Sequence, residues 1–301
     1  MQPAAPTQTT RQRNAAGIVA MLLAMACYVT NDTFVKVVSD DLPVGQIIFI
    51  RGVFGSVLVF GFLAWRGLLR DFAPLKHWSV SARVVTEMLA TVLFLSALVR
   101  MPIANAMAIL QGVPFMVTIL AVIILKETVG WRRWSAILVG FMGMLMVVQP
   151  GLEGFQSAAW LAVAAMVTMS LRDIVTTYLP ENVGSLMVTA ITMATLMVLG
   201  AASSLFGNWE PPDAMNLFCL FCASVFLIGG HFFMTEATRN AEMSAIAPFR
   251  YSILFWAFLY GWLIWGDLPN LLAVSGILVI VGSGLYVWQR EQRVREKDGV
   301  A

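Results

Sequence analysis

The sequence predicts an all-α membrane protein with ten transmembrane helices, and composition and patterning carry this prediction. Of its 301 residues, 59% are hydrophobic and only 12% are charged. Soluble proteins carry about 25% charged residues, so most of this apolar surface needs lipid as its solvent. The apolar runs are long and continuous, whereas the strands of a membrane β-barrel alternate apolar and polar residues. A single span needs about 20 mostly apolar residues.

Segments with turn chemistry, such as "DDLPVG" (40–45) and "NWEPPD" (208–213), separate the apolar runs. The first run lacks a small-residue cleavage motif, so we expect a retained helix and not a removed signal peptide. Polar tails are expected at 1–15 and 289–301. The ten spans are expected at 16–38, 46–66, 80–99, 103–125, 132–149, 157–178, 184–206, 215–237, 243–265 and 270–288.

Lys and Arg are distributed unequally between the two sides of this topology. If the N-terminus is cytoplasmic, fourteen of these residues fall in inside segments and only Arg100 falls in an outside loop. This is the asymmetry of the positive-inside rule. We therefore expect an integral protein of the plasma membrane, the inner membrane of a bacterium, with both termini in the cytoplasm.

The two halves of the chain repeat each other. "FLSALVRMPIANAMAI" (94–109) resembles "FMTEATRNAEMSAIAP" (233–248), and "ILKETVGWRRWSAILVGFMGM" (124–144) resembles "IWGDLPNLLAVSGILVIVGSG" (264–284). Each half holds five spans, an odd number, so the second half enters the membrane in the opposite orientation. We expect a five-plus-five inverted repeat, with units at 16–149 and 150–288. Such repeats are typical of secondary transporters, whose binding sites lie at the midplane between the halves.

These segments and the ten spans resemble the drug/metabolite transporter superfamily of the EamA type. In that family an acid ends the fourth span of each half; Glu127 fits, and Asp267 replaces the second glutamate. The resemblance covers about 16–288 and implies transport of a small metabolite or drug. The segment "YVTNDTFVKVVSDDLPVGQIIFIRG" (28–52) resembles the bacterial riboflavin-transporter branch.

Charged residues within spans are costly in lipid, so they are candidates for the substrate site or for ion pairs. Asn31 and Asp32 are expected to line a central cavity. Alternatively, Asp32 neutralises Lys36 one turn later, and Lys36 reaches the outer interface. Arg51 cannot lose its charge. It is expected either to brace the first two spans by pairing with Asp32 or to bind substrate.

Glu87 is the most central carboxylate of the sequence. It could carry a proton or bind a polar substrate, and pairing with Arg83 is the alternative. Arg172 and Asp173 project about 100° apart on a helix. We therefore expect them to form gating ion pairs with other groups and not with each other.

Arg250 follows Pro248, and broken backbone is tolerated in a membrane where it lines a cavity. We expect Arg250 to bind substrate, with Tyr251 beside it as a ring-stacking candidate. An ion pair of Arg250 with Glu236 or Asp173 is the alternative. Pro114 is expected to give the first half a similar break, with Gln111 shortly before it as the corresponding polar candidate.

Signals for other functions are missing from the sequence. It has no nucleotide-binding Gly-x-x-x-x-Gly-Lys-Ser/Thr loop and no loop large enough for a catalytic domain. We expect no enzyme activity, no cofactor, no metal site and, at a net charge of +2, no nucleic-acid partner. A membrane-embedded transferase or flippase, or a channel, is the alternative class. Arg51, Arg250 and neighbouring aromatic residues would suit riboflavin or a related ring metabolite. Export of amino acids or drugs is the alternative transport function.

Overall fold

The computed structural model describes residues 10–67, 77–126, 131–149, 158–180, 185–204, 209–241 and 246–297. In these ranges every regular element is a helix or helical turn. The first half comprises α1 (Thr10–Val38), α2 (Val44–Trp65), α3 (Trp78–Leu98), α4 (Ile103–Leu110), α5 (Val113–Ile124) and α6 (Trp131–Val148). The second comprises α7 (Ala158–Thr176), α8 (Ser185–Ser204), α9 (Ala214–Asn240), η2 (Ala247–Tyr251), α11 (Ser252–Tyr260), the π-helical turn η3 (Gly261–Trp265) and α12 (Leu271–Lys297).

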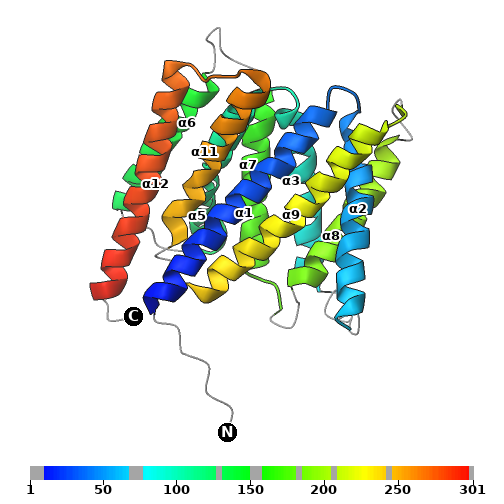
Figure 1. Ribbon diagram of the computed structural model, residues 1–301. Coiled ribbons are helices and arrows are strands. Elements are labelled where there is room, and N and C mark those ends of the chain that lie inside the picture. The colour runs from blue at the N-terminus through cyan, green and yellow to red at the C-terminus, as the bar shows by residue number, and fades with distance from the viewer. Residues whose placement is uncertain are drawn as a thin grey trace.

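These elements form ten membrane-crossing segments, as predicted. Among the described residues, six segments are long and apolar enough to span a bilayer, counting α4 and α5 as one. Three shorter apolar stretches lie in α6, α8 and α12. The tenth segment is divided into η2, α11 and η3. Figure 1 shows that α1 begins and α12 ends at the same end of the bundle, as an even number of crossings requires. Glu127 lies outside the described residues.

The packing of the helices obeys the symmetry of the inverted repeat. Exchange of the two halves pairs α1 with α7, α2 with α8, α3 with α9, α4 with α11 and α6 with α12. The most extensive contacts are α1 with α9, α3 with α7, α2 with α8 and α6 with α12. Exchange converts the first contact into the second and leaves the other two unchanged. In Figure 1, α6 and α12 lie at one end of the bundle and α2 and α8 at the other. The principal helix contacts thus join the two halves.

One helix in each half is broken. Between α4 and α5 the chain turns at Gly112, and Pro114 falls in the first turn of α5, where its missing N–H costs little. A Cβ on Gly112 would lie 2.5 Å from the sulfur of Met166, so glycine permits α5 to start close against α7. In the second half, Pro248 similarly lies in the first turn of η2. Both breaks occur in the mutually packed segments α4/α5 and η2/α11.

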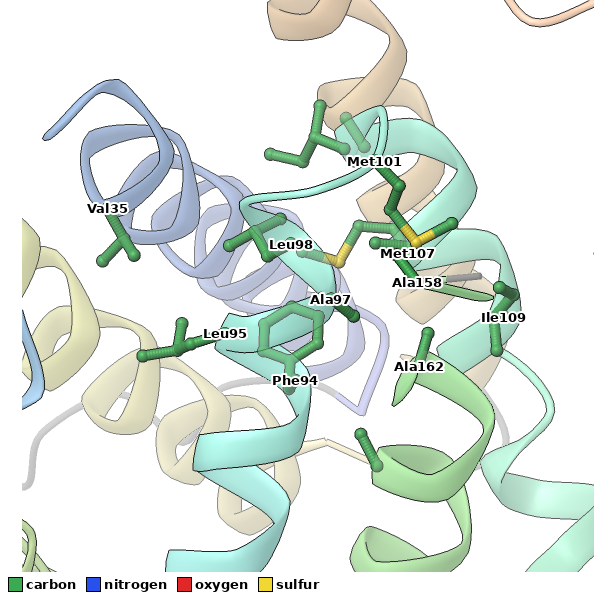
Figure 2. Close-up of a cluster of buried hydrophobic side chains, with 14 of the residues drawn as sticks. Val35, Phe94, Leu95, Ala97, Leu98, Met101, Met107, Ile109, Ala158 and Ala162 are labelled. Carbon is green, nitrogen blue, oxygen red and sulfur yellow. The ribbon is translucent and has the colours of Figure 1, made fainter. Parts of the chain in front are cut away.

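The largest apolar cluster lies where α1, α3, α4 and α7 meet. Figure 2 shows Val35 of α1, Phe94 and Leu98 of α3 and Met107 of α4 converging on one another, with Ala158 and Ala162 of α7 beside them. The small side chains on α7 allow this helix to approach the larger ones closely. This cluster joins helices of both halves at the outer end of the bundle, defined as the end at which α1 finishes.

Polar contacts connect neighbouring elements at the outer end. The side-chain amides of Gln149 and Asn270 bond reciprocally at 2.8 and 3.0 Å, joining the end of α6 to the start of α12. Gln46 exchanges two hydrogen bonds with the backbone of Glu210. These contacts satisfy polar groups where the chain enters and leaves the membrane.

Candidate functional site

A cluster of polar side chains, the central polar cluster, lies in the interior where α1, α2, α3 and α7 approach one another. It consists of Asn31, Asp32, Arg51, Glu87, Arg172 and Asp173. Its first part comes from α1 and α2, where Asn31 is 3% exposed, Asp32 8% and Arg51 6%. Nδ2 of Asn31 donates to Oδ1 of Asp32 at 2.8 Å. Arg51 interacts electrostatically with Asp32 and with Glu87 on α3. In the described part of the chain, no hydrogen bond or ion pair within 4.0 Å engages its guanidinium.

The second part of the cluster is an ion-pair network between α3 and α7. Nη1 of Arg172 donates to both carboxylate oxygens of Glu87, at 3.0 and 3.3 Å. Nη2 and Nε of the same guanidinium donate to Oδ1 of Asp173, at 2.8 and 3.0 Å. One turn away, Nε of Arg83 donates to Oγ1 of Thr176. Arg172 thus bridges two carboxylates and connects the first half to the second.

One expectation about these ion pairs is wrong, and one alternative is not found among the described contacts. Arg172 and Asp173 do pair with each other, because the long arginine side chain folds back over the 100° between adjacent positions. Glu87 pairs with Arg172 on the neighbouring helix. Its alternative partner, Arg83, bonds to Thr176 and interacts with Glu87 only through its charge.

The alternative intrahelical pair between Asp32 and Lys36 is also absent from the described contacts. Nζ of Lys36 donates to the backbone carbonyl of Met101 and lies 5.1 Å from the ring centroid of Trp265. Its carboxylate neighbours are Asp40 and Asp267. Lys36 therefore belongs to the outer end of the bundle, whereas Asp32 faces Arg51.

The remaining expected site residues lie at or beyond the edge of the cluster. Arg250 is exposed and interacts electrostatically with Tyr28 of α1 and with Tyr251. The hydroxyl of Tyr251 points at α12, where a Cβ on Gly284 would come within 1.5 Å of it. Gln111 is half-buried at the break between α4 and α5. The structure thus brings together six of the ten expected residues, places Arg250 at their edge, and separates Lys36, Gln111 and Tyr251 from them.

The structure adds aromatic and polar neighbours that the set of expected site residues did not include. The hydroxyl of Tyr28 lies 3.1 Å from Nδ1 of His231 on α9, and both groups interact electrostatically with Glu87 and Arg172. Oγ1 of Thr30, next to Asn31, lies 3.1 Å from the hydroxyl of Tyr260 on α11. The rings of Tyr260 and Trp256 lie 6.4 Å apart. In the sequence, these positions appear only as polar and aromatic residues at helical spacing. Helix packing alone produces the same pattern, so it did not indicate a binding role.

Several buried polar atoms have no hydrogen-bond partner in the part of the chain that the structure describes. In the described ranges they are Oδ1 of Asn31, Oδ1 of Asn105, Nε1 of Trp256 and the hydroxyls of Ser56 and Ser252. An unmatched buried polar group costs about 1–3 kcal/mol. A binding site can bear this cost, because a ligand or water supplies the missing partner when the site opens. Sequence reasoning found Asn31 from its charged neighbour, but had no comparable signal at Asn105.

In the parts of the chain that the structure describes, no group of three or more His, Cys, Asp or Glu side chains is arranged to hold a metal ion. Cys27, Cys219 and Cys222 are free thiols within helices.

Both halves of the chain match one known protein family. Residues 15–149 and again residues 156–288 match the EamA-like transporter family. The chain belongs to this family. The two matches cover both halves of the bundle, in agreement with the symmetry of the helix contacts. The chain is an integral membrane protein of a family of transporters.

Characterised relatives transport different compounds. The S-adenosylmethionine uptake transporter of Rickettsia felis is 24% identical over 93% of this chain and 95% of its own length. The riboflavin transporter of Rhizobium johnstonii is 26% identical over 85% and 84%. The pseudopaline exporter of Pseudomonas aeruginosa is 25% identical over 88% and 93%. A solved crystal structure has the same fold, with a TM-score of 0.60 and 15% identity over 92% of this chain and 96% of that one.

Proposed function

We propose that this EamA-family protein is a secondary transporter that moves a small metabolite across the bacterial inner membrane by alternating access. The observation that supports this proposal most is the central polar cluster. It lies between the two halves within the membrane, where burying charged groups costs free energy. Buried charges of this kind mark substrate and ion pathways. The halves rock about the cluster and expose it to each side in turn, with both termini in the cytoplasm.

Riboflavin or a related aromatic metabolite is the substrate that we propose. One relative is a riboflavin transporter. Tyr28, Trp256 and Tyr260 supply aromatic faces near the α1 part of the cluster. The central polar cluster itself holds two guanidinium groups, Arg51 and Arg172, and three carboxylates, Asp32, Glu87 and Asp173. With Arg83 and Arg250 beside it, the opposite charges nearly balance, which is compatible with a neutral ring that carries hydrogen-bond acceptors.

Export of an amino acid or drug is the second candidate. The pseudopaline exporter among the relatives supports export. The presence of both charge signs in the cluster would suit the ammonium and carboxylate of an amino acid. Counterflow measurements distinguish riboflavin from an amino acid or drug as the substrate, because a carrier exchanges only the compounds that its site binds.

The test is uptake of radiolabelled riboflavin into proteoliposomes that contain the purified protein. We expect saturable uptake and accelerated exchange when the vesicles are preloaded with unlabelled riboflavin. Arg51→Gln should lower uptake about tenfold or more, because a site cation is lost. The matched control is Arg100→Gln, which removes an exposed arginine of an outer loop and should retain wild-type uptake. Absence of riboflavin uptake or exchange by the wild-type protein would reject this substrate.

A further inference from the structure

The first part of the central polar cluster contains unmet hydrogen-bonding capacity of two kinds. Arg51 carries five N–H donors and no acceptor. The residue as a whole is 6% exposed, and in the part of the chain that the structure describes its guanidinium makes no hydrogen bond and no ion pair within 4.0 Å. Oδ1 of Asn31 is a buried acceptor without a donor. A ligand that satisfies both groups must present an acceptor and a donor.

The orientation of the Asn31 amide follows from its neighbour. The NH₂ group of Asn31 faces Asp32, where it donates to Oδ1 at 2.8 Å. The carbonyl oxygen of Asn31 must therefore point away from Asp32. This fixes Asn31 as the acceptor of the pair, while Arg51 is the donor.

The charges of this part of the cluster favour a neutral ligand group. Asp32 and Arg51 interact with each other, and each is more than nine-tenths buried. Their charges therefore offset one another, and the set of Asn31, Asp32 and Arg51 is neutral as a whole. The ammonium of an amino acid would need an anion of its own, and its carboxylate would need a cation of its own.

An aromatic pair lies against α1 at the position next to Asn31. Thr30 precedes Asn31 and contacts Tyr260, whose ring neighbours Trp256 on α11. The indole N–H of Trp256 is itself buried and without a partner. Aromatic side chains therefore lie beside α1 at the position that precedes Asn31.

From these observations we infer that Asn31 and Arg51 bind the edge of a planar heterocycle on which a ring N–H lies next to a ring carbonyl, as in a cyclic imide. The ring N–H donates to Oδ1 of Asn31, and the adjacent carbonyl accepts from Arg51. Opening of the halves about the cluster exposes Oδ1 of Asn31 to the ligand. The inference rests on the proposed transport of a ring metabolite and assigns which edge of the ring is recognised.

Riboflavin and N3-methylriboflavin test the Asn31 contact, because they differ only in the imide N–H. In competition with labelled riboflavin, the methylated compound should bind the wild-type protein about tenfold or more weakly than riboflavin. In Asn31→Ala the difference should shrink to about twofold or less, because the partner of the N–H is gone. Arg100→Gln should keep the wild-type difference.

Each outcome of this experiment decides the inference. Equal inhibition by the two flavins in the wild-type protein overturns it, even if riboflavin is transported. An undiminished difference in Asn31→Ala overturns it too. Strong inhibition by free amino acids, without any effect of N3 methylation, assigns the pair to an amino–carboxylate group and also overturns it.

A second measurement applies if Asn31→Ala fails to fold or if wild-type vesicles do not take up riboflavin. Thermal stabilisation of the purified wild-type protein is then compared for lumichrome and 3-methyllumichrome, which carry the ring without the polyol tail. Stabilisation by lumichrome alone supports the inference. Equal stabilisation by both compounds, or by neither, overturns it. Failure of riboflavin uptake with selective binding of lumichrome rejects the proposed substrate but retains the recognised edge.

Discussion

Arg172 forms an ion pair that joins α7 to α3. Its guanidinium donates to Glu87 of the other helix and to its own neighbour Asp173. The side chain of Glu87 is 22% exposed and that of Asp173 is 40% exposed. Because solvent weakens an exposed pair more than a buried one, the bond to Glu87 should matter more for stability.

Glu87→Gln should lower the free energy of unfolding by about 1–3 kcal/mol, because one charged hydrogen-bond partner of Arg172 becomes neutral. Thermal unfolding of the purified protein in detergent measures this effect. Asp173→Asn is the matched variant and should have a smaller effect. The double variant Glu87→Arg/Arg172→Glu, which exchanges the two charges, should recover part of the stability that Glu87→Gln loses. A larger loss in Asp173→Asn than in Glu87→Gln would contradict this view of the network.

At the scale of single residues, the sequence predicted which charged residues lie within the membrane but not how they pair. Asp32 and Arg51 were expected as neighbours because they lie at similar depth on consecutive spans. Arg172 has rotamers that reach its own neighbour and others that reach α3, and only the packing of α7 against α3 allows it to do both. Asn105 and Trp256 give no sequence signal of function, because polar and aromatic residues are common in packed helices.

At the scale of the elements, close helix packing depends on small residues at crossings. α6 and α12 cross where Gly143 faces Gly276: a Cβ on Gly143 would lie 2.8 Å from the carbonyl oxygen of Gly276. A flexible side chain can change its rotamer to avoid a clash, but a backbone carbonyl in a helix cannot. This crossing therefore requires glycine on both helices.

Gly143→Ala should lower the free energy of unfolding by about 1–3 kcal/mol, because the added methyl group forces the two helices apart. Gly61→Ala is the control: its Cβ would meet no heavy atom within 4 Å, so it should be neutral or slightly stabilising. Thermal unfolding of both variants in one detergent makes the comparison. Equal destabilisation by the two substitutions would show that the effect does not arise at the crossing.

Apolar length was sufficient to predict the ten segments, whereas their interruptions depend on tertiary contacts. Proline predicted a break near position 114, but the division into α4 and α5 also requires Gly112 to lie against Met166. The π-helical turn at Gly261–Trp265 has no pattern in the sequence that would predict it. α12 continues to Lys297, beyond the expected end at 288, because "QREQRVREK" consists largely of good helix formers.

At the scale of the whole molecule, the expected orientation remains to be measured. Fusion of green fluorescent protein to the C-terminus should give fluorescent cells, and fusion of alkaline phosphatase there should give inactive enzyme, because the distribution of Lys and Arg predicts a cytoplasmic C-terminus. A phosphatase fusion after Arg100, in an outer loop, is the matched control and should be active. The opposite pattern of activities would invert the orientation of the entire bundle.

The contacts between the halves have a consequence for biosynthesis. The hydroxyl of Tyr28 meets His231, 203 residues later in the chain, and α1 packs mainly against α9. When α1 leaves the ribosome, its permanent partner has not yet been made. Until α9 inserts, the part of α1 that carries Tyr28 lacks its final neighbour, so α1 should first contact either other nascent helices or the insertion machinery. Truncation before α9 should therefore yield an inserted but unassembled product that quality-control proteases degrade.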